Sequence, residues 1–261
     1  MRGSAPVIRM PSAAARTLAL CAGLALALSA CSADEDPDEG TNGVGKLSAT
    51  QIEEKARAAA DGADAVRLSG TLVSKGGTYK LNMRLKEAGA TGSVASKDAT
   101  FELLRIEDEL YLKADAAFWT HQDEGGSGAG QDEGKGGPEA ADKLDDKYVK
   151  VPEDDPAYKR FRGFTDKKAL LAGLLDLHGE AEKGDRGELG GVRTIQVKGG
   201  EEGDGGTLSV ALEGIPYPLQ FARGGGAGVL RLSDWALDFP LAAPREDDTV
   251  DYEDELPKSK G

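Results

Sequence analysis

The stretch TYKLNMRLK, residues 78–86, alternates apolar and polar side chains without a break. Its apolar positions are Tyr79, Leu81, Met83 and Leu85. Because successive side chains of a strand point to opposite faces, this period of two predicts a strand with one dry face and one wet face. Such a strand is typical of an antiparallel sheet that is covered on one side only.

The same period recurs on both sides of this stretch. Residues 66–72 alternate in the same way, and Gly76-Gly77 between the two segments is a candidate hairpin turn. Further short strands are predicted at 92–96, 101–106, 109–114, 148–151, 192–198, 207–214, 218–224 and 228–241. In the last of these, Trp235, Leu237 and Phe239 are expected to share one face. The pattern thus predicts about ten strands.

Two helical segments interrupt the strands. Residues 48–61 have a weak apolar stripe, and Thr50 with Glu53 fits a capping box at its start. Residues 165–179, with Thr165 as the expected N-cap, have the strongest helical stripe in the chain, made by Leu170, Leu171, Leu174, Leu175 and Leu177. Strands that follow one another, with helices inserted, predict an α+β fold built on a single large antiparallel sheet.

The first thirty residues have the composition of a secretory signal. Three arginines and no acid accompany an apolar run over residues 17–30, which is too short for the roughly 20 residues that span a bilayer. The run ends in LSAC, which resembles the lipobox of bacterial lipoproteins. This resemblance implies that residues 1–30 are removed and that Cys31 carries a diacylglyceryl anchor at the outer face of the cell membrane. The alternative is an ordinary cleaved signal with an incidental cysteine.

Three polar stretches flank or interrupt a domain that we expect at residues 47–242. Residues 31–46 are acidic and rich in glycine, which favours a flexible tether. Residues 120–146 are a glycine-rich, low-complexity insert that is expected to be disordered. Residues 243–261 are expected to be a solvated acidic tail, with one short paired segment near Thr249.

Composition excludes several classes of function. The chain has a formal charge of −14, which argues against nucleic acid as a partner because phosphate binding needs clustered Lys and Arg. Cys21 lies inside the signal, so the mature chain would keep only the acylated Cys31 and could form no disulfide.

Chemical motifs are sparse as well. His121 and His178 have no second histidine or cysteine nearby, and no common hydrolase, phosphate-loop or zinc motif is present. The acidic runs lack the spacing of a calcium loop. We therefore expect no catalytic residue, no metal and no cofactor.

Three segments in order carry a resemblance to a known family. They are VRLSGTLVSKGGTYKLNMRL (66–85), FELLRIEDELYLKADAAFW (101–119) and LSVALEGIPYPLQFARG (208–224), the last followed by VLRLSDW. Together they resemble the LppX/LprG-type lipoproteins of actinobacteria and, more distantly, the carriers LolA and LolB. The resemblance covers roughly residues 47–242, and the 120–146 insert departs from it.

The resemblance implies a half-barrel, in which one curved sheet wraps over helices and leaves an apolar cavity that binds or shuttles lipids. From the pattern, the residues expected to face that space are Tyr79, Leu81, Met83, Leu85, Leu170, Leu171 and Leu174. A tightly packed core predicts the same alternation. The leading hypothesis is therefore a membrane-anchored carrier of a lipid or other hydrophobic ligand. The alternative is a non-catalytic interaction or sensor lipoprotein that meets another envelope protein.

Overall fold

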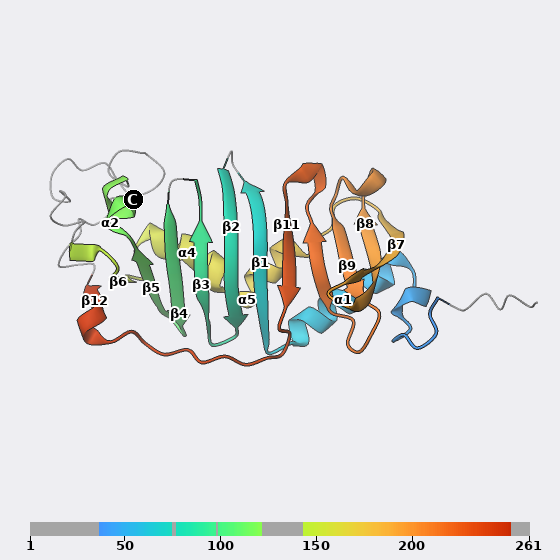
Figure 1. Cartoon of the computed structure of the whole chain (residues 1–261), viewed down its shortest axis with the longest axis horizontal. Coiled ribbons are helices and arrows are strands. Elements are labelled where there is room, and N and C mark those ends of the chain that lie inside the picture. Colours follow the sequence, from blue (N-terminus) through green and yellow to red (C-terminus); the bar gives the residue numbers. More distant parts are fainter. Residues whose placement is uncertain (1–36, 75–76, 98, 122–142, 252–261) are drawn as a thin grey trace, which may run out of the picture. The chain divides into compact units, whose positions relative to one another are not determined.

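A computed structural model describes residues 37–74, 77–97, 99–121 and 143–251 of the chain. Their strands form one open, curved sheet in the order β12-β6-β5-β4-β3-β2-β1-β11-β10-β9-β8-β7 (Figure 1). All neighbouring strands are antiparallel except β12 and β6, which are parallel. The predicted α+β class with a single, mainly antiparallel sheet is confirmed.

The described part of the chain contains twelve strands, where the sequence predicted about ten. They are β1 (Ala65–Ser74), β2 (Gly77–Lys86), β3 (Gly89–Ala95), β4 (Thr100–Ile106), β5 (Glu109–Ala114), β6 (Tyr148–Val151), β7 (Ala181–Leu189), β8 (Val192–Gly199), β9 (Thr207–Ala211), β10 (Pro218–Ala222), β11 (Gly228–Ser233) and β12 (Thr249–Asp251). The sequence missed β7 because its residues are mostly exposed and charged, which leaves no apolar alternation to detect.

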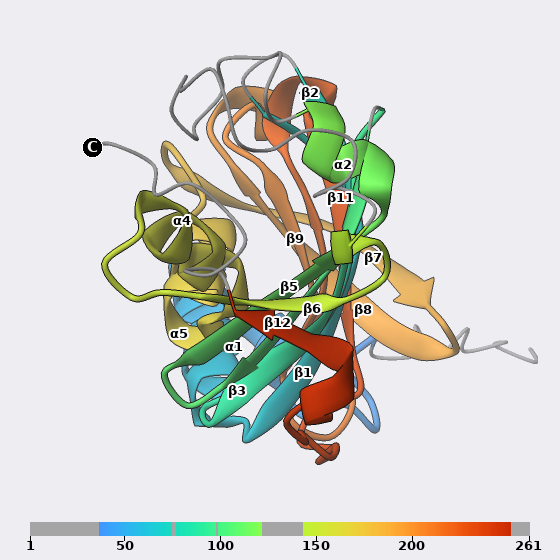
Figure 2. The same cartoon turned by 90° about the vertical axis from the view of Figure 1, so that its left-hand side faces the viewer.

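Helices α1 (Ala49–Gly62), α4 (Pro156–Thr165) and α5 (Lys167–Leu174) lie against one face of the sheet (Figure 2). We call the face toward these helices the inner face and the opposite one the outer face. Helix α2 (Ala116–His121) follows β5, and short 3₁₀ turns occur at η1 (Val44–Lys46), η2 (Glu201–Gly203), η3 (Gly224–Gly226) and η4 (Glu246–Asp248).

Strand β2 shows how the sequence pattern becomes the two faces. Leu81, Met83 and Leu85 are at most 2% exposed, whereas Asn82 and Arg84 between them are exposed. The predicted alternation is therefore confirmed. Apolar residues from α1, α4 and α5 join those of the inner face in one contiguous core.

Both predicted helix caps are wrong by one or two residues. Ser48 caps α1, since its hydroxyl accepts from the Gln51 amide and the Gln51 side chain accepts from the Ser48 amide. Thr50 lies inside the helix. Asp166 caps α5 by accepting from the Ala169 amide. Thr165 instead ends α4, so its hydroxyl is used to donate to the preceding turn.

Two buried cations tie the helices together and to the sheet. Arg105 on β4 donates to the carbonyl of Thr165 at the end of α4, at 3.0 Å from Nη2. Lys167 at the start of α5 donates to the carbonyl of Ala63, just after α1. A positive charge is favourable at these sites because carbonyls at a helix C-terminus carry partial negative charge. Burial lowers the pKa of Arg105, and the charge of Arg162 lowers it further.

The expectation of a flexible tether over 31–46 is wrong for residues 37–46. The Asn42 amide donates to the carbonyl of Leu212 at 2.7 Å. Asp38 pairs with Arg186 at 2.7 Å, and Val44 is only 6% exposed. Composition could not show this because the partners lie about 150 to 170 residues away. Residues 31–36 lie outside the described part of the chain.

The expected disorder of the 120–146 insert is wrong for its last residues. Leu144 is helical and 1% exposed, and Asp146 pairs with Lys113 at 2.9 Å. Residues 122–142 lie outside the described range. In the acidic tail, the expected short paired segment is β12, which runs beside β6, while residues 252–261 are not described.

Candidate functional site

The residues predicted to line a cavity lie on the inner face and are brought together. Leu171 and Leu174 of α5 belong to the same apolar core as Leu81, Met83 and Leu85 of β2, and all five are at most 8% exposed. Tyr79 and Leu170 are half-buried and pack against that core. Whether this space admits a ligand stays a prediction.

An aromatic cluster adjoins these residues at the β4–α4 end of the inner face. It consists of Phe101 on β4, Phe118 and Trp119 on α2, and Phe161 on α4. The Phe101 ring centroid lies 5.5 Å from those of Phe118 and Phe161, and the Phe118 centroid lies 5.1 Å from that of Trp119. These distances are in the range of favourable aromatic pairs.

Strand register connects the predicted cavity to this aromatic cluster. Leu81 pairs with Val94 on β3, and Val94 pairs with Phe101 on β4. Because neighbouring strands are about 4.8 Å apart, Leu81 and Phe101 lie about 10 Å apart in one row across the inner face. Phe118 and Trp119 lie in the segment 101–119, whose pattern assigns them no role. Only the docking of α2 and α4 brings them together.

The indole of Trp119 differs from the other buried side-chain donors and acceptors of the residues that the structure describes. Its Nε1 is buried and has no hydrogen-bond partner among the residues that the structure describes. A buried donor without an acceptor costs about 1–3 kcal/mol, and such groups in native structures call for an explanation. An acceptor oxygen supplied by a bound molecule would remove this cost.

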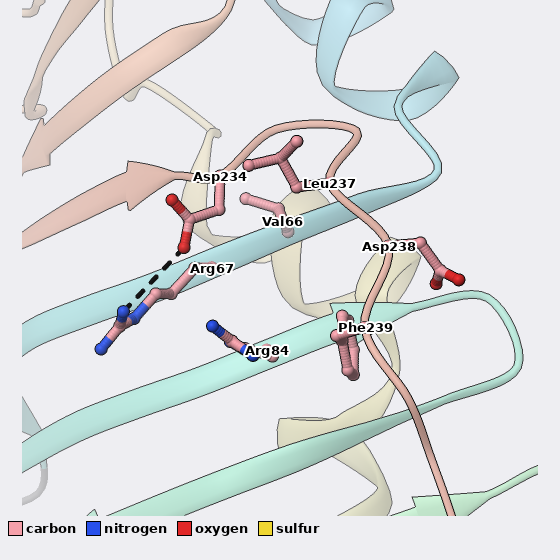
Figure 3. A pocket seen from close by; sticks show the side chains of 7 residues that line it. All are labelled: Val66, Arg67, Arg84, Asp234, Leu237, Asp238 and Phe239. Carbon is pink, nitrogen blue, oxygen red and sulfur yellow. Dashed lines mark ion pairs between the residues drawn. The ribbon is translucent and has the colours of Figure 1, made fainter.

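A second candidate site lies on the outer face and was not predicted. It is a pocket of about 450 Å³ lined by Val66, Arg67, Arg84, Asp234, Leu237, Asp238 and Phe239, and we call it the outer pocket (Figure 3). Strands β1 and β2 form its floor, and the chain that follows β11 forms its wall.

The chain that forms this wall shows that the predicted strand over residues 228–241 is wrong beyond Ser233. Trp235, Leu237 and Phe239 do not share a strand face, because β11 ends at Ser233 and a turn follows in which Asp234 and Ala236 have φ of 51° and 59°. Positive φ at non-glycine residues cannot be inferred from an alternating pattern. As a result, Leu237 is 63% exposed while Phe239 is 5% exposed.

The turn is fixed by contacts on both sides. The Ala236 amide donates to the carbonyl of Ala65 at 2.9 Å. The Trp235 ring stacks on Tyr217 at 4.8 Å, and its Nε1 donates to the carbonyl of Pro218 at 3.0 Å. The wall of the outer pocket is therefore held in place by the neighbouring strands.

The charges around the outer pocket are unevenly paired. Lys86 Nζ lies 2.7 Å from Asp238 Oδ1, and this hydrogen bond lowers the pKa of the Asp238 carboxyl. Arg67 is 3.9 Å from Asp234 and donates to the Asn82 side chain at 3.2 Å. The guanidinium carbon of Arg84 lies 6.0 Å from the centre of the Phe239 ring.

A metal site and a membrane-spanning helix are both absent from the described ranges. No group of three His, Cys, Asp or Glu side chains there is arranged to hold a metal. None of the described helices is long and apolar enough to cross a membrane. His178 is exposed, with Nδ1 3.9 Å from Asp176. Cys31 and the side chain of His121 are not described.

Comparison with known proteins returned solved structures only. No family model and no curated protein matches the chain. The crystal structure of LprF from Mycobacterium bovis is similar at 15% identity and a TM-score of 0.47, covering 75% of this chain and 96% of that one. LprF is a mycobacterial lipoprotein of the LppX/LprG family, the family that the sequence resembles.

Two other structures are similar at lower identity. An uncharacterized conserved protein from Thermus thermophilus is 9% identical, with a TM-score of 0.37, 78% of this chain covered and 98% of that one. A DUF1329 family protein from Desulfovibrio piger is 9% identical, with a TM-score of 0.23, 74% of this chain covered and 95% of that one.

Proposed function

We propose that this protein is an envelope lipoprotein, anchored at the outer face of the cell membrane through Cys31, that holds a hydrophobic ligand between the sheet and the helices. The observation that carries the proposal is the buried, unpartnered Nε1 of Trp119 within the aromatic cluster. The proposal assigns no catalytic residue, cofactor or metal.

The position of Trp119 suggests the chemistry of the ligand. The indole packs against the Phe118 ring, which in turn contacts Phe101 on β4, so an acyl chain could lie against apolar surface there. The free indole N–H would then donate to an oxygen of the same molecule, as the carbonyl of an ester or a fatty acid would provide. A lipid combines both features, whereas a hydrocarbon would leave the indole unpaired.

Two tryptophans make this site directly testable. The chain contains only Trp119 and Trp235, the second of which belongs to the outer-face turn. In a Trp235→Phe variant of the full chain in detergent, a dibrominated fatty acid should quench the fluorescence of Trp119. In the matched Trp119→Phe variant, the same acid should leave Trp235 unquenched. Equal quenching of both tryptophans, or of neither, would rule out a ligand at the aromatic cluster.

The anchor has its own test. Cys31→Ser should leave an unprocessed precursor without acyl chains, because the serine hydroxyl cannot replace the thiolate as acceptor of the diacylglyceryl group. Mass spectrometry of the membrane fraction measures both maturation and acylation. A variant that matures and stays membrane-bound like the parent would disprove the lipoprotein part of the proposal.

A second candidate is an interaction lipoprotein with a solid core that binds another envelope protein. The observation that favours it is the near-complete burial of Leu81, Met83 and Leu85, which a tightly packed core also produces. Native mass spectrometry of the protein purified from its own membranes separates the two candidates. A bound lipid beyond the anchor supports the carrier, and a co-purifying protein without lipid supports the interaction module.

A further inference from the structure

The outer pocket brings two arginines together on a strongly acidic protein. Arg67 on β1 and Arg84 on β2 are directly opposite each other in the sheet register. Like charges in such a cross-strand pair are destabilising. Figure 3 shows the two side chains on neighbouring strands β1 and β2, with Arg67 pointing toward Asp234 of the chain that follows β11. The chain as a whole has a charge of −14, so this pair is a local departure from the overall charge.

The carboxylates near the pocket neutralise these arginines only in part, because only Arg67 has a carboxylate within 4.0 Å among the described residues. Within the described residues, no carboxylate lies within 4.0 Å of Arg84. Asp234 is 3.9 Å from Arg67, which is longer than the roughly 2.7–2.9 Å of a charge-assisted hydrogen bond. Asp238 is already paired with Lys86 at 2.7 Å. Two guanidinium groups thus keep donors available to a further anion.

The wall beside the arginines is held in place by the neighbouring strands, and it carries Leu237 and Phe239 next to Asp234 and Asp238. Leu237 is 63% exposed beside the pocket, and the ring of Phe239 lies under the Arg84 guanidinium. Asp234 and Ala236 adopt positive φ to place this wall. Such backbone conformations cost about 1–3 kcal/mol each and cluster at ligand-binding sites.

We propose that the outer pocket binds a phosphate monoester with an apolar organic group, and that Arg67 and Arg84 hold the phosphate while Leu237 and Phe239 contact the organic group. Guanidinium groups match the geometry of phosphate oxygens and bind them through paired hydrogen bonds. A phosphate monoester dianion carries two negative charges, which balance the positive charges of both arginines, whereas a carboxylate carries only one. Asp234, which now faces Arg67 at long range, would move away from the bound phosphate.

The site differs from the lipid site proposed above in both position and chemistry. Arg84 points away from the helices, since it alternates with the buried Met83 and Leu85 on β2. Either proposal can therefore fail without the other. The phosphate chemistry could come from a soluble ester or from a lipid headgroup, and the probes below distinguish these two sources.

The test is calorimetric titration of the full chain, in a neutral detergent at pH 8, with phenyl phosphate as the probe. At this pH the monoester is a dianion, because its second pKa is about 6. Saturable binding is expected, and inorganic phosphate should bind more weakly because it lacks the apolar group. Arg84→Met should weaken phenyl phosphate binding by about tenfold or more, through loss of a charged hydrogen-bond donor.

Two further variants make the test specific. Arg231→Met is the matched control, since Arg231 is exposed on the same outer face but does not line the pocket. Its loss of affinity should be clearly smaller than that of Arg84→Met, because Arg231 is not among the pocket residues that would donate to the phosphate. Asp234→Asn should strengthen binding by removing the competing carboxylate, which a purely structural role of Asp234 does not predict.

Micelles doped with phosphatidic acid should displace phenyl phosphate if the natural source is a lipid headgroup, and should leave it bound if the source is soluble. The proposal is overturned by absence of saturable binding at millimolar phenyl phosphate. It is equally overturned by parent-like affinity in Arg84→Met, by equal losses in Arg84→Met and Arg231→Met, or by inorganic phosphate binding as tightly as the ester.

Discussion

The inner and outer faces of the sheet use the same strands in different ways. On the inner face, Leu81, Met83 and Leu85 pack into a core, and the polar groups there have fixed partners, as Arg105 does at the end of α4. On the outer face, Arg67 and Arg84 stand opposite each other, and only Arg67 has a carboxylate of the described residues within 4.0 Å, that of Asp234 at 3.9 Å. Burial imposes the pairing on the inner face, because an unpaired charge there would be costly. On the outer face, solvent tolerates charges that are weakly paired or unpaired, such as those of Arg67 and Arg84, which leaves them available for binding.

The largest expected effect on stability comes from substitutions on the two faces of strand β2. Leu81→Ala should lower the free energy of unfolding by about 2–5 kcal/mol, since it removes buried methyl groups and leaves a cavity. Its neighbour Asn82 points to the outer face, so Asn82→Ala should change stability by no more than about 0.5 kcal/mol. Urea denaturation measures both. Similar losses in the two variants would contradict the two-faced arrangement of β2.

A second prediction compares two arginines, one on each face. Arg105→Met should cost about 1–3 kcal/mol, because Arg105 is 5% exposed and its loss leaves the carbonyls of Thr165 and Glu107 without a donor. Arg231→Met on the outer face should leave stability within about 0.5 kcal/mol of the parent. Thermal unfolding under identical buffer conditions checks the pair. An unaffected Arg105 variant would show that α4 does not depend on this contact.

The third prediction concerns the row of residues from Leu81 to the aromatic cluster. If a ligand occupies space beside this row, Leu81→Trp should reduce acyl-chain binding while costing less than the roughly 1–3 kcal/mol of an overpacked core. The two measurements are dibrominated fatty acid binding and urea denaturation. A fully destabilised variant would favour the interaction module, and Met83→Trp serves as a second position in the same strand.

The smallest expected effect is an acid-sensitive contact in the helix layer. Arg57 on α1 donates to Asp176 at 2.9 Å, and this hydrogen bond holds the pKa of the Asp176 carboxyl below its usual value of 3.8. Because the folded-state pKa is depressed, the contact contributes stability at neutral pH that is lost as the pH falls through the folded-state value.

Asp176→Asn should therefore remove a small part of the acid dependence of the melting temperature below about pH 4 and leave the rest of the profile unchanged. Lys168 and Glu87, 3.2 Å apart and exposed, provide a control pair. A profile for Asp176→Asn that coincides with the parent throughout would show that the contact is absent in solution.

The alternating pattern determined most of the fold. The unbroken alternation over residues 78–86 was enough to place β2, because burial on one face forces side chains into a period of two. The helix predicted over residues 165–179 is shorter in the structure, where α5 ends at Leu174. Leu171 and Leu174 face the core from the helix, whereas Leu175 and Leu177 are buried beyond its end. The pattern failed where burial was absent, as in exposed β7, or where backbone conformation departed from the strand, as at Asp234.

The candidate sites depended on the tertiary structure. Phe101 and Phe161 are 60 positions apart in the sequence, and Arg67 and Asp234 are farther apart still, so no local pattern could show that they meet. The sequence alone determined an alternating sheet, a leucine-rich helix and a cysteine placed like an acylation site. The packing of α2 and α4 against β4 determined that the Trp119 Nε1 is left without an acceptor among the described residues. The turn after β11 determined that Arg67 and Arg84 share a pocket. The reason is physical: periodicity records which side of a strand is buried, whereas a binding site depends on which distant side chains the fold brings within contact.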